Sequence, residues 1–257
     1  MLGLRNLYRV FHESRSAARK HTTVSVTGDT PEAEGLADLL EAQRSAVGAE
    51  ILLAVTVAPN GASSVEVHAS GDAVEDAETL VLPAVSEETV LRELAPCLVR
   101  ALDEDYLVSL GRGYPVFRRA VCEEIIRKNA RQNAFIGALP IPGADMPAIT
   151  ANQGRMVLGI AAVYGEEISF ERARELIGVL AAGFGFRALT RQVVKLVPVG
   201  GWAASGAIGY AGTLAMGRTA MLYFERGKRE PDPEELSKIK HWASEETKAF
   251  LSRLRRR

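Results

Sequence analysis

Cysteine is nearly absent from this chain of 257 residues, which contains only Cys97 and Cys122. Two cysteines without a CxxC pair cannot build a disulfide framework or a four-cysteine zinc site. We therefore expect both side chains to pack in a core, and the chain to fold in a reducing compartment.

Histidine and the residue patterns of common catalytic sites are also scarce. The four histidines lack the spacing of a metal site such as HExxH; they are His12, His21, His68 and His241. No G-x-S-x-G turn is present to expose a nucleophilic serine. The sequence therefore predicts no metal, no cofactor and no catalytic residues, and we expect a protein that is not an enzyme.

A secretory signal is missing as well. Residues 1–20 are basic and contain no continuous apolar stretch followed by the small residues of a cleavage site. We therefore expect the chain to remain in the cytoplasm, where a membrane would present its inner face to it.

Each part of the chain has few charges of one sign, although the whole chain is nearly balanced with a net charge of −1. Residues 1–21 carry five Lys or Arg against one acid, residues 22–110 three against seventeen, and residues 111–257 twenty-three against fourteen. The acidic middle would repel phosphates, which argues against nucleic acid as a partner. The basic ends instead predict contact with anionic membrane lipid or with an acidic protein surface.

Residues 1–21 have the pattern of a basic amphipathic helix. Leu4, Leu7, Tyr8 and Phe11 recur at helical spacing, with arginines between them. Two interpretations stay open at this point: the helix docks on its own domain, or it lies as a foot on a membrane surface.

Residues 22–110 predict a small α/β domain with a mostly parallel sheet. Apolar runs rich in β-branched residues are typical of strands, and the last of these candidates is the weakest: 22–27, 51–58, 79–85 and 65–69. Helix-like stretches alternate with them, as in parallel sheets. Ser86 has the position of a helix cap, and Pro96 should kink or end the helix that follows.

From Pro115 onward the strand pattern gives way to helical periodicity, which predicts an all-α bundle rich in Gly and Ala. Its first helix should begin at Pro115 and carry an apolar stripe leading to Phe135: Phe117, Val121, Ile125 and Ile126. Three prolines at 139–147 interrupt it, and Asp145 should cap the next helix. Further helices are expected at 169–197 and 198–226, and residues 228–257 form a linker and an amphipathic C-terminal helix.

Three stretches of this half resemble a known family: PIPGADMPAITANQGRMVLGIAAVYGEE, FGFRALTRQVVKLVPVGGW and AMGRTAMLYFERG. They look like the GTPase-associated domain of unknown function of the YcjF-like family, which follows Era-like GTPase domains in many bacterial proteins. The resemblance spans residues 115–227 and brings no assigned chemistry. It implies that residues 22–110 are a degenerate GTPase-like or Rossmann-like domain.

A working GTPase needs a phosphate loop, G-x-x-x-x-G-K-S/T, after its first strand. Aligned from Gly28, this chain has Ala33, Glu34 and Gly35 at the glycine, lysine and hydroxyl positions. An anion thus replaces the cation that neutralises phosphate, and the hydroxyl that binds magnesium is lost. The guanine-binding NKxD motif is also missing. We therefore expect no nucleotide to bind.

Two sets of polar residues in the helical half are candidate contact sites. Cations at a spacing of four share one helix face: Arg187, Arg191 and Lys195. They are either a solvent-facing stripe or a contact for lipid phosphate or an acidic partner. The second set predicts a structural hydrogen-bond network: Asp145, Asn152, Gln153 and Arg155.

Residues 196–217 contain no charged side chain and are long enough to cross a bilayer. Gly, Ala, Ser and Thr dominate the run, so its hydrophobicity is below that of a Leu-rich span. Small residues recur at every fourth position, as in a glycine zipper: Gly201, Ser205, Gly209, Thr213 and Gly217. Integral insertion, peripheral attachment and a fully soluble bundle all stay open.

These features favour a non-catalytic scaffold or regulatory protein that acts at or near the inner face of the cytoplasmic membrane. One alternative is a GTPase or other phosphoryl-transfer enzyme with an unorthodox phosphate site near Gly28 and Asp29. Another is an integral membrane protein that forms homo-oligomers through the stripe of small residues.

Overall fold

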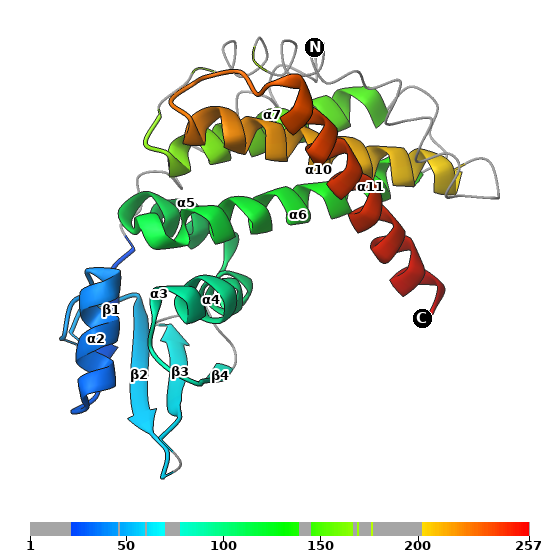
Figure 1. Cartoon of the computed structure of the whole chain (residues 1–257). Helices are drawn as coiled ribbons and strands as arrows, with labels where there is room; N and C mark the ends of the chain where they lie inside the picture. The colour runs from blue at the N-terminus through cyan, green and yellow to red at the C-terminus, as the bar shows by residue number, and fades with distance from the viewer. Residues whose placement is uncertain are drawn as a thin grey trace. The chain divides into compact units, whose positions relative to one another are not determined.

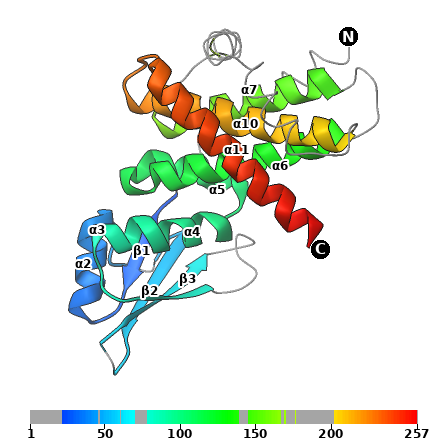
Figure 2. The ribbon, with the colours of Figure 1, turned by 45° about the vertical axis from the view of Figure 1, so that its right-hand side comes forward.

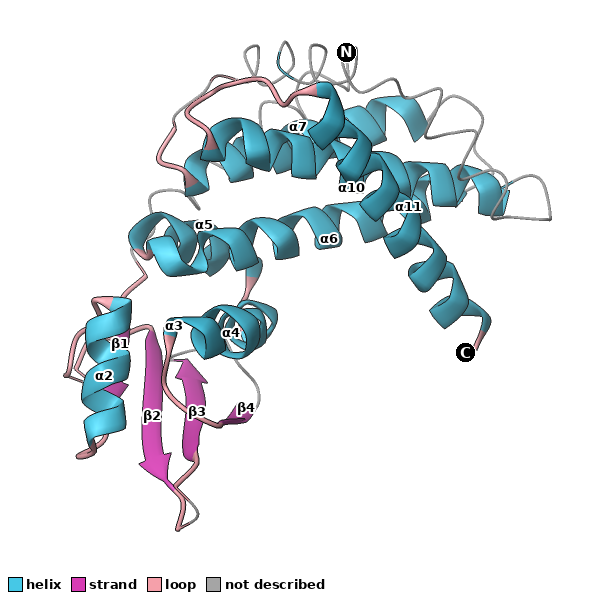
Figure 3. Cartoon of the chain, in the orientation of Figure 1, coloured by secondary structure: helices cyan, strands magenta, loops and turns pink. Residues whose placement is uncertain are grey.

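The computed structural model describes residues 22–45, 47–59, 61–69, 78–138, 145–166 and 202–256, with the single positions 169 and 176. They divide into two compact units, and the boundary falls after Glu124, inside one long helix (Figure 1). The first unit holds the sheet, and the second consists of helices (Figure 3). The fold class predicted from the sequence, a small α/β part followed by a helical part, is confirmed.

The sheet has four strands in the order β1-β2-β3-β4. Their bounds are β1 Val24–Thr27, β2 Ile51–Val57, β3 Ser63–Ala69 and β4 Glu78–Leu82. Strand β1 pairs with β2 in parallel, whereas β2 with β3 and β3 with β4 are antiparallel. The four strand candidates are thus confirmed, but the expectation of a mostly parallel sheet is wrong.

The short connection between β2 and β3 explains why these strands pair in antiparallel fashion. A parallel connection needs a dozen or more residues, and only residues 58–62 lie between β2 and β3. This hairpin is closed by hydrogen bonds that the amides of Ala58 and Gly61 donate to the carbonyls of Ala62 and Ala58, at 2.9 and 2.8 Å. Among the described connections of the sheet, the one between β1 and β2 contains a helix, α2 (Pro31–Leu40), which makes the parallel pair possible.

Helix α2 closes one side of the sheet because its apolar residues recur at helical spacing. Ala33, Leu36, Ala37 and Leu40 are buried, and Thr30 caps the first turn by accepting a hydrogen bond from the amide of Ala33. The strands contribute their inward residues to the same core: Val24, Val26, Ile51 and Leu53 are fully buried.

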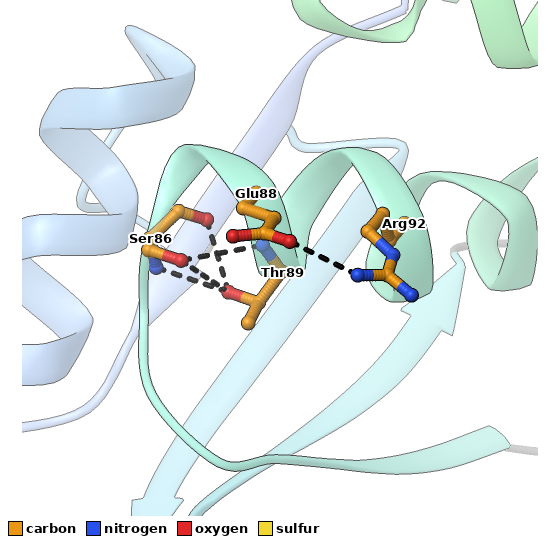
Figure 4. Close-up of polar contacts among 4 residues, drawn as sticks. All are labelled: Ser86, Glu88, Thr89 and Arg92. Carbon is orange, nitrogen blue, oxygen red and sulfur yellow. Dashed lines mark hydrogen bonds and ion pairs between the residues drawn. The ribbon is translucent and has the colours of Figure 1, made fainter.

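Ser86 begins the next helical stretch, as the sequence predicts. Its hydroxyl accepts a hydrogen bond from the amide of Thr89 at 3.2 Å, and the Thr89 hydroxyl accepts one from the Ser86 amide at 3.0 Å (Figure 4). One turn further, Arg92 pairs with Glu88 at 2.9 Å on the exposed side. This capping box fixes the residue at which the helix after β4 begins.

Of the two effects expected of Pro96, a kink or an end of the helix, the end is wrong, because the helical stretch continues through Pro96. Helix α3 (Glu87–Thr89) passes into a π-helix, η1 (Val90–Leu94), and then into α4 (Ala95–Ala101). The amide of Ala95 donates to the carbonyl of Val90, five residues back. The wider π turn gives the proline ring room beside the carbonyls that it would crowd in an α-helix.

The sheet unit ends with α5 (Glu104–Gly113), the 3-10 turn η2 (Pro115–Phe117) and the start of α6 (Arg118–Ala138). Pro115 lies at the beginning of a helical segment, as predicted. The Val24 amide donates to the Tyr114 hydroxyl at 2.8 Å, and the hydroxyls of Thr22 and Ser109 share a hydrogen bond. Cys97 and Cys122 are buried, as expected, and neither forms a disulfide.

The helical unit consists, among described residues, of α6 from Ile125 onward, α7 (Asp145–Val163), α10 (Trp202–Glu225) and α11 (Pro233–Arg255). Helix α10 packs against both α7 and α11 (Figure 2). A capping box between Asp232 and Glu235 starts α11. Helices α10 and α11 confirm the sequence-predicted helices at 198–226 and within 228–257.

Several expectations fall outside the described residues. They are the amphipathic helix at 1–21, the helix at 169–197 and the cation stripe Arg187, Arg191 and Lys195. Within the described part of the chain, no helix is both long enough and apolar enough to cross a membrane. Gly201, the first residue of the small-residue stripe, also lies outside the described part.

Candidate functional site

Two asparagines occupy the buried face of α6. Asn129 and Asn133 are one helical turn apart, and they are 2% and 0% exposed. They follow Ile125 and Ile126 on the helix, so amide groups continue a face that begins with aliphatic side chains. A buried amide is costly unless it is hydrogen-bonded, which makes its partners the important feature here.

Asn133 is the centre of a network that joins three helices. Its Nδ2 donates to Thr213 Oγ1 of α10 at 2.8 Å, and its Oδ1 accepts from Asn152 Nδ2 of α7 at 2.9 Å. Asn152 Nδ2 also lies 3.3 Å from the backbone carbonyl of Asn129, to which it donates. The Thr213 hydroxyl donates a hydrogen bond to the carbonyl of Gly209 at 2.8 Å. The network therefore fixes α6, α7 and α10 in one register.

Asn129 is the incompletely satisfied member of this group. Its Nδ2 donates to the backbone carbonyl of Ile125 at 2.8 Å, but its buried Oδ1 has no hydrogen-bond partner among the described residues. Leaving a buried acceptor unpaired costs about 1–3 kcal/mol. The helical unit thus holds a buried acceptor that is unpaired within the described part of the chain.

A shallow groove between α6 and α7 lies beside the network. Its volume is about 350 Å³, and its lining is mostly apolar: Gln132, Phe135, Ile136, Ala148, Ala151, Asn152 and Arg155. Phe135 is 69% exposed, so the apolar stripe of α6 ends on the surface rather than in the core. Asn152 belongs to both groove and network. The groove offers apolar contact, two amides and one cation, which suits binding rather than proton transfer.

Of the four residues predicted to form a polar network, the structure shows only some in the expected surroundings. Asn152 joins the three-helix network, and Arg155 lies in the groove wall. Gln153 is half-buried on α7, and Asp145 is the first residue of that helix, with its side chain outside the described part. Sequence reasoning missed Asn129 and Asn133, although two asparagines four residues apart on an apolar helix face are a recognisable pattern.

The stripe of small residues faces α6 of the same chain. A Cβ added to Gly209 would lie 2.8 Å from the Asn133 carbonyl oxygen, and one added to Gly217 would lie 2.5 Å from Ile126 Cγ1. Thr213 is fully buried between them, whereas Ser205 is exposed. Gly206, which is not part of the stripe, also lies against the backbone of α6. The small residues thus allow α6 and α10 to approach closely.

Tyr210 and Phe250 form a second contact point, between α10 and α11. Their rings stack with centroids 4.2 Å apart and planes 8° from parallel. Burial raises the pKa of the Tyr210 phenol, and Glu246 raises this pKa further. Three arginines act in the opposite direction: Arg131, Arg127 and Arg253. Charges from α6 and α11 therefore gather around one hydroxyl of α10.

In the sheet unit, the segment aligned with the phosphate loop is part of a helix. Only Gly28, Asp29 and Thr30 lie between β1 and α2. The amides of Ala33 and Glu34 donate to the Thr30 carbonyl at 3.0 and 3.2 Å, so they are not available to a phosphate. Gly28 has a φ of 134°, and the carbonyl oxygen of Val55 occupies the space that a Cβ would need. Its role in the structure is therefore a close backbone approach.

The helical unit and the last residues of the preceding unit define the class of protein. Residues 114–246 match the family model described as "Domain of unknown function (DUF697)". This is more than half of the chain, and the chain belongs to that family. The resemblance inferred from the sequence motifs is thereby confirmed, and the family match extends into α11.

A search of curated proteins adds one relative. The chain is similar to "Magnetosome membrane protein 22" of Magnetospirillum gryphiswaldense, with 29% identity over 120 residues that cover 44% of this chain. The match covers 62% of the relative, so the chain spans less than two thirds of its length. No solved structure matches the chain.

Proposed function

We propose that this protein is a non-catalytic scaffold or regulatory protein that works at the inner face of a membrane, with its helical unit as the binding part. The similarity to Magnetosome membrane protein 22, whose name assigns that relative to a membrane, carries the proposal. The charge distribution supports it, because the acidic region is confined to residues 22–110 and the rest of the chain is basic.

The chemistry of the helical unit is that of a binding site. The network of Asn129, Asn133, Asn152 and Thr213 contains amides and one hydroxyl, which neither gain nor lose a proton near neutral pH. The adjoining groove adds apolar surface. Such groups hold helices and a partner in place, whereas acid–base catalysis requires groups that titrate near the working pH.

The geometry of the sheet unit argues against the phosphoryl-transfer alternative. The helix amides that would surround a phosphate already bond to Thr30, and Glu32 and Glu34 place two negative charges in the first turn of α2. A phosphate would be repelled by these carboxylates. The α/β unit is therefore proposed as a domain that binds no nucleotide.

The alternative of assembly through the small-residue stripe is also disfavoured. Gly209, Thr213 and Gly217 pack within the chain against α6 and α7. A second molecule could reach this stripe only if α10 separated from α6, which would break the bond between Asn133 and Thr213. Any homo-oligomer is therefore proposed to use another surface.

Cell fractionation tests the proposal. The full chain, expressed in bacterial cells, should sediment with membranes, and washes with high salt or alkaline buffer should release it. Release is expected because electrostatic attachment is screened by salt. Retention after both washes would indicate integral insertion and contradict peripheral attachment. Recovery in the supernatant before any wash would overturn the membrane proposal itself.

A further inference from the structure

The helical unit carries a surface that is basic and apolar at once. Helix α6 from Ile125 to its end has three cations and no acid, namely Arg127, Lys128 and Arg131. Residues 247–256, the last turns of α11 and the residue after it, have four cations and no acid. These two stretches are far apart in the chain, and α11 crosses over α6 in both Figure 1 and Figure 2.

The stacked pair Tyr210 and Phe250 locates the meeting point of the two stretches. Arg253 follows Phe250 by three residues on α11, and the charges of Arg253 and of Arg131 on α6 both lower the pKa of the Tyr210 phenol. Each is exposed, and neither forms an ion pair with another described residue. Glu246 is the acid that faces the same hydroxyl. The local excess of positive charge therefore remains available to a ligand.

Exposed apolar side chains accompany these arginines. Phe135 follows Arg131 by four residues, which places both on the same side of α6, and Phe135 is 69% exposed. Leu254 follows Phe250 by four residues, so it continues the side of α11 that carries the stacked ring, and it is 56% exposed. Water-exposed Phe and Leu are unfavourable, but they gain free energy when they enter the acyl boundary of a bilayer while adjacent arginines contact phosphate groups.

We propose that Arg131, Phe135, Arg253 and Leu254 form a docking surface for an anionic lipid membrane, and we name it the α6/α11 surface. Its charge fits lipid phosphate and carboxylate groups, and its aromatic and aliphatic tips fit the region below them. A nucleic acid would also satisfy the charges, but it offers no place for Leu254. This surface specifies the contact in the proposed membrane function and rests on that proposal.

Vesicle sedimentation with the full chain tests the α6/α11 surface. The wild-type protein should bind vesicles of phosphatidylcholine with about 30% phosphatidylserine, and binding should fall as salt rises from about 0.1 to 0.5 M. Each basic residue near an anionic surface contributes roughly a factor of five, so R131Q/R253Q should bind at least tenfold more weakly. The matched control R92Q/R119Q removes two exposed arginines of the sheet unit and should bind as the wild type does.

Insertion of the exposed apolar side chains into the bilayer is measured separately, by fluorescence quenching at Phe135. A Phe135→Trp variant should be quenched by brominated lipid more strongly than the wild type, whose Trp202 and Trp242 provide the background. Thermal unfolding of every variant checks that folding is intact. Equal loss of binding in both double variants, or no added quenching, would overturn the α6/α11 surface.

Two further outcomes separate this surface from the proposed function. If R131Q/R253Q still fractionates with cell membranes as the wild type does, the α6/α11 surface is wrong and the membrane function stands. If the wild-type chain binds no vesicle and is recovered in the cell supernatant, both are wrong. Binding to single-stranded RNA that is lost in R131Q/R253Q, without vesicle binding, would identify a nucleic-acid surface instead and reject the lipid.

Discussion

The backbone carbonyl oxygen of Asn133 lies 2.8 Å from the point that a Cβ at Gly209 would occupy. Because Gly209 has no side chain, α10 comes near enough to α6 for the Asn133 amide to reach the Thr213 hydroxyl at 2.8 Å. The contact between the helix backbones and the buried polar bond therefore depend on each other. A substitution at Gly209 or at Asn133 should therefore weaken both the backbone contact and the hydrogen bond to Thr213.

Gly209→Ala should destabilise the protein, although alanine is the better helix former. A methyl group at this position must displace backbone of α6, and such overpacking costs about 1–3 kcal/mol, which exceeds the gain of about 1 kcal/mol in helix propensity. We expect a lower midpoint of urea unfolding, measured by circular dichroism.

Gly35→Ala in α2 is the matched control. A Cβ at Gly35 would meet no atom within 4 Å, so the same substitution should raise the free energy of unfolding by about 0.4–1 kcal/mol. A stabilised Gly209→Ala protein would show that α6 and α10 are not in close contact.

The two asparagines of α6 should respond differently to replacement by leucine. Asn133→Leu leaves Thr213 and Asn152 without their buried partner, and we expect a loss of about 2–4 kcal/mol. Asn129→Leu removes an acceptor that is already unpaired and should cost less. Chemical denaturation of both variants provides the comparison, and equal costs would mean that Asn129 has a partner in solution.

Tyr210 should make stability depend on pH in the alkaline range. Burial, aided by Glu246, raises the pKa of its phenol above 10.0 in the folded state. From about pH 10 upward the unfolded chain therefore loses this proton first, and stability falls as pH rises towards the folded pKa. Tyr210→Phe keeps the stacking on Phe250 but cannot titrate.

The drop in the urea midpoint between about pH 9 and about pH 10.5 should be smaller in Tyr210→Phe than in the wild type. Lysine titration affects both proteins alike and cancels in the difference. An identical drop in both proteins would show that the phenol titrates normally.

Restoring the missing lysine should not create a nucleotide site. Glu34→Lys supplies the cation, but Ala33 stays buried inside α2 and the amides of residues 33 and 34 still bond to Thr30. We expect no magnesium-dependent GTP binding by calorimetry in either the wild type or this variant. Micromolar affinity in the variant would mean that the start of α2 can open into a phosphate loop.

In the α/β unit, sequence patterns were sufficient to predict the positions of the strands but not their relative directions. Apolar β-branched runs located all four strands, and Ser86 was found because a cap depends on local bonds. Strand direction depends on how the strands are connected. The Asn60-Gly61 pair between two strand runs is typical of a hairpin, and it would have predicted the antiparallel pair.

The candidate site was less predictable, because it depends on which residues of different helices meet. Asn152 was expected in a polar network, but its partner Asn133 is 19 residues away on another helix. Polar residues on a helix are usually exposed, so the position of Asn129 and Asn133 on the apolar face of α6 was the one sequence signal that they are buried. Phe135 is the opposite case, since hydrophobicity predicted burial and the residue is exposed.

The π segment at Val90–Leu94 gives this part of the chain a tolerance to changes in length. A π turn holds one residue more than the α turn that it replaces, so it accommodates an insertion without rotating the turns on either side. Deleting Leu91, which is 42% exposed, together with Pro96→Ala would leave a continuous α-helix with Leu98 still in the core. At this turn, we therefore expect two chain lengths to be compatible with one domain.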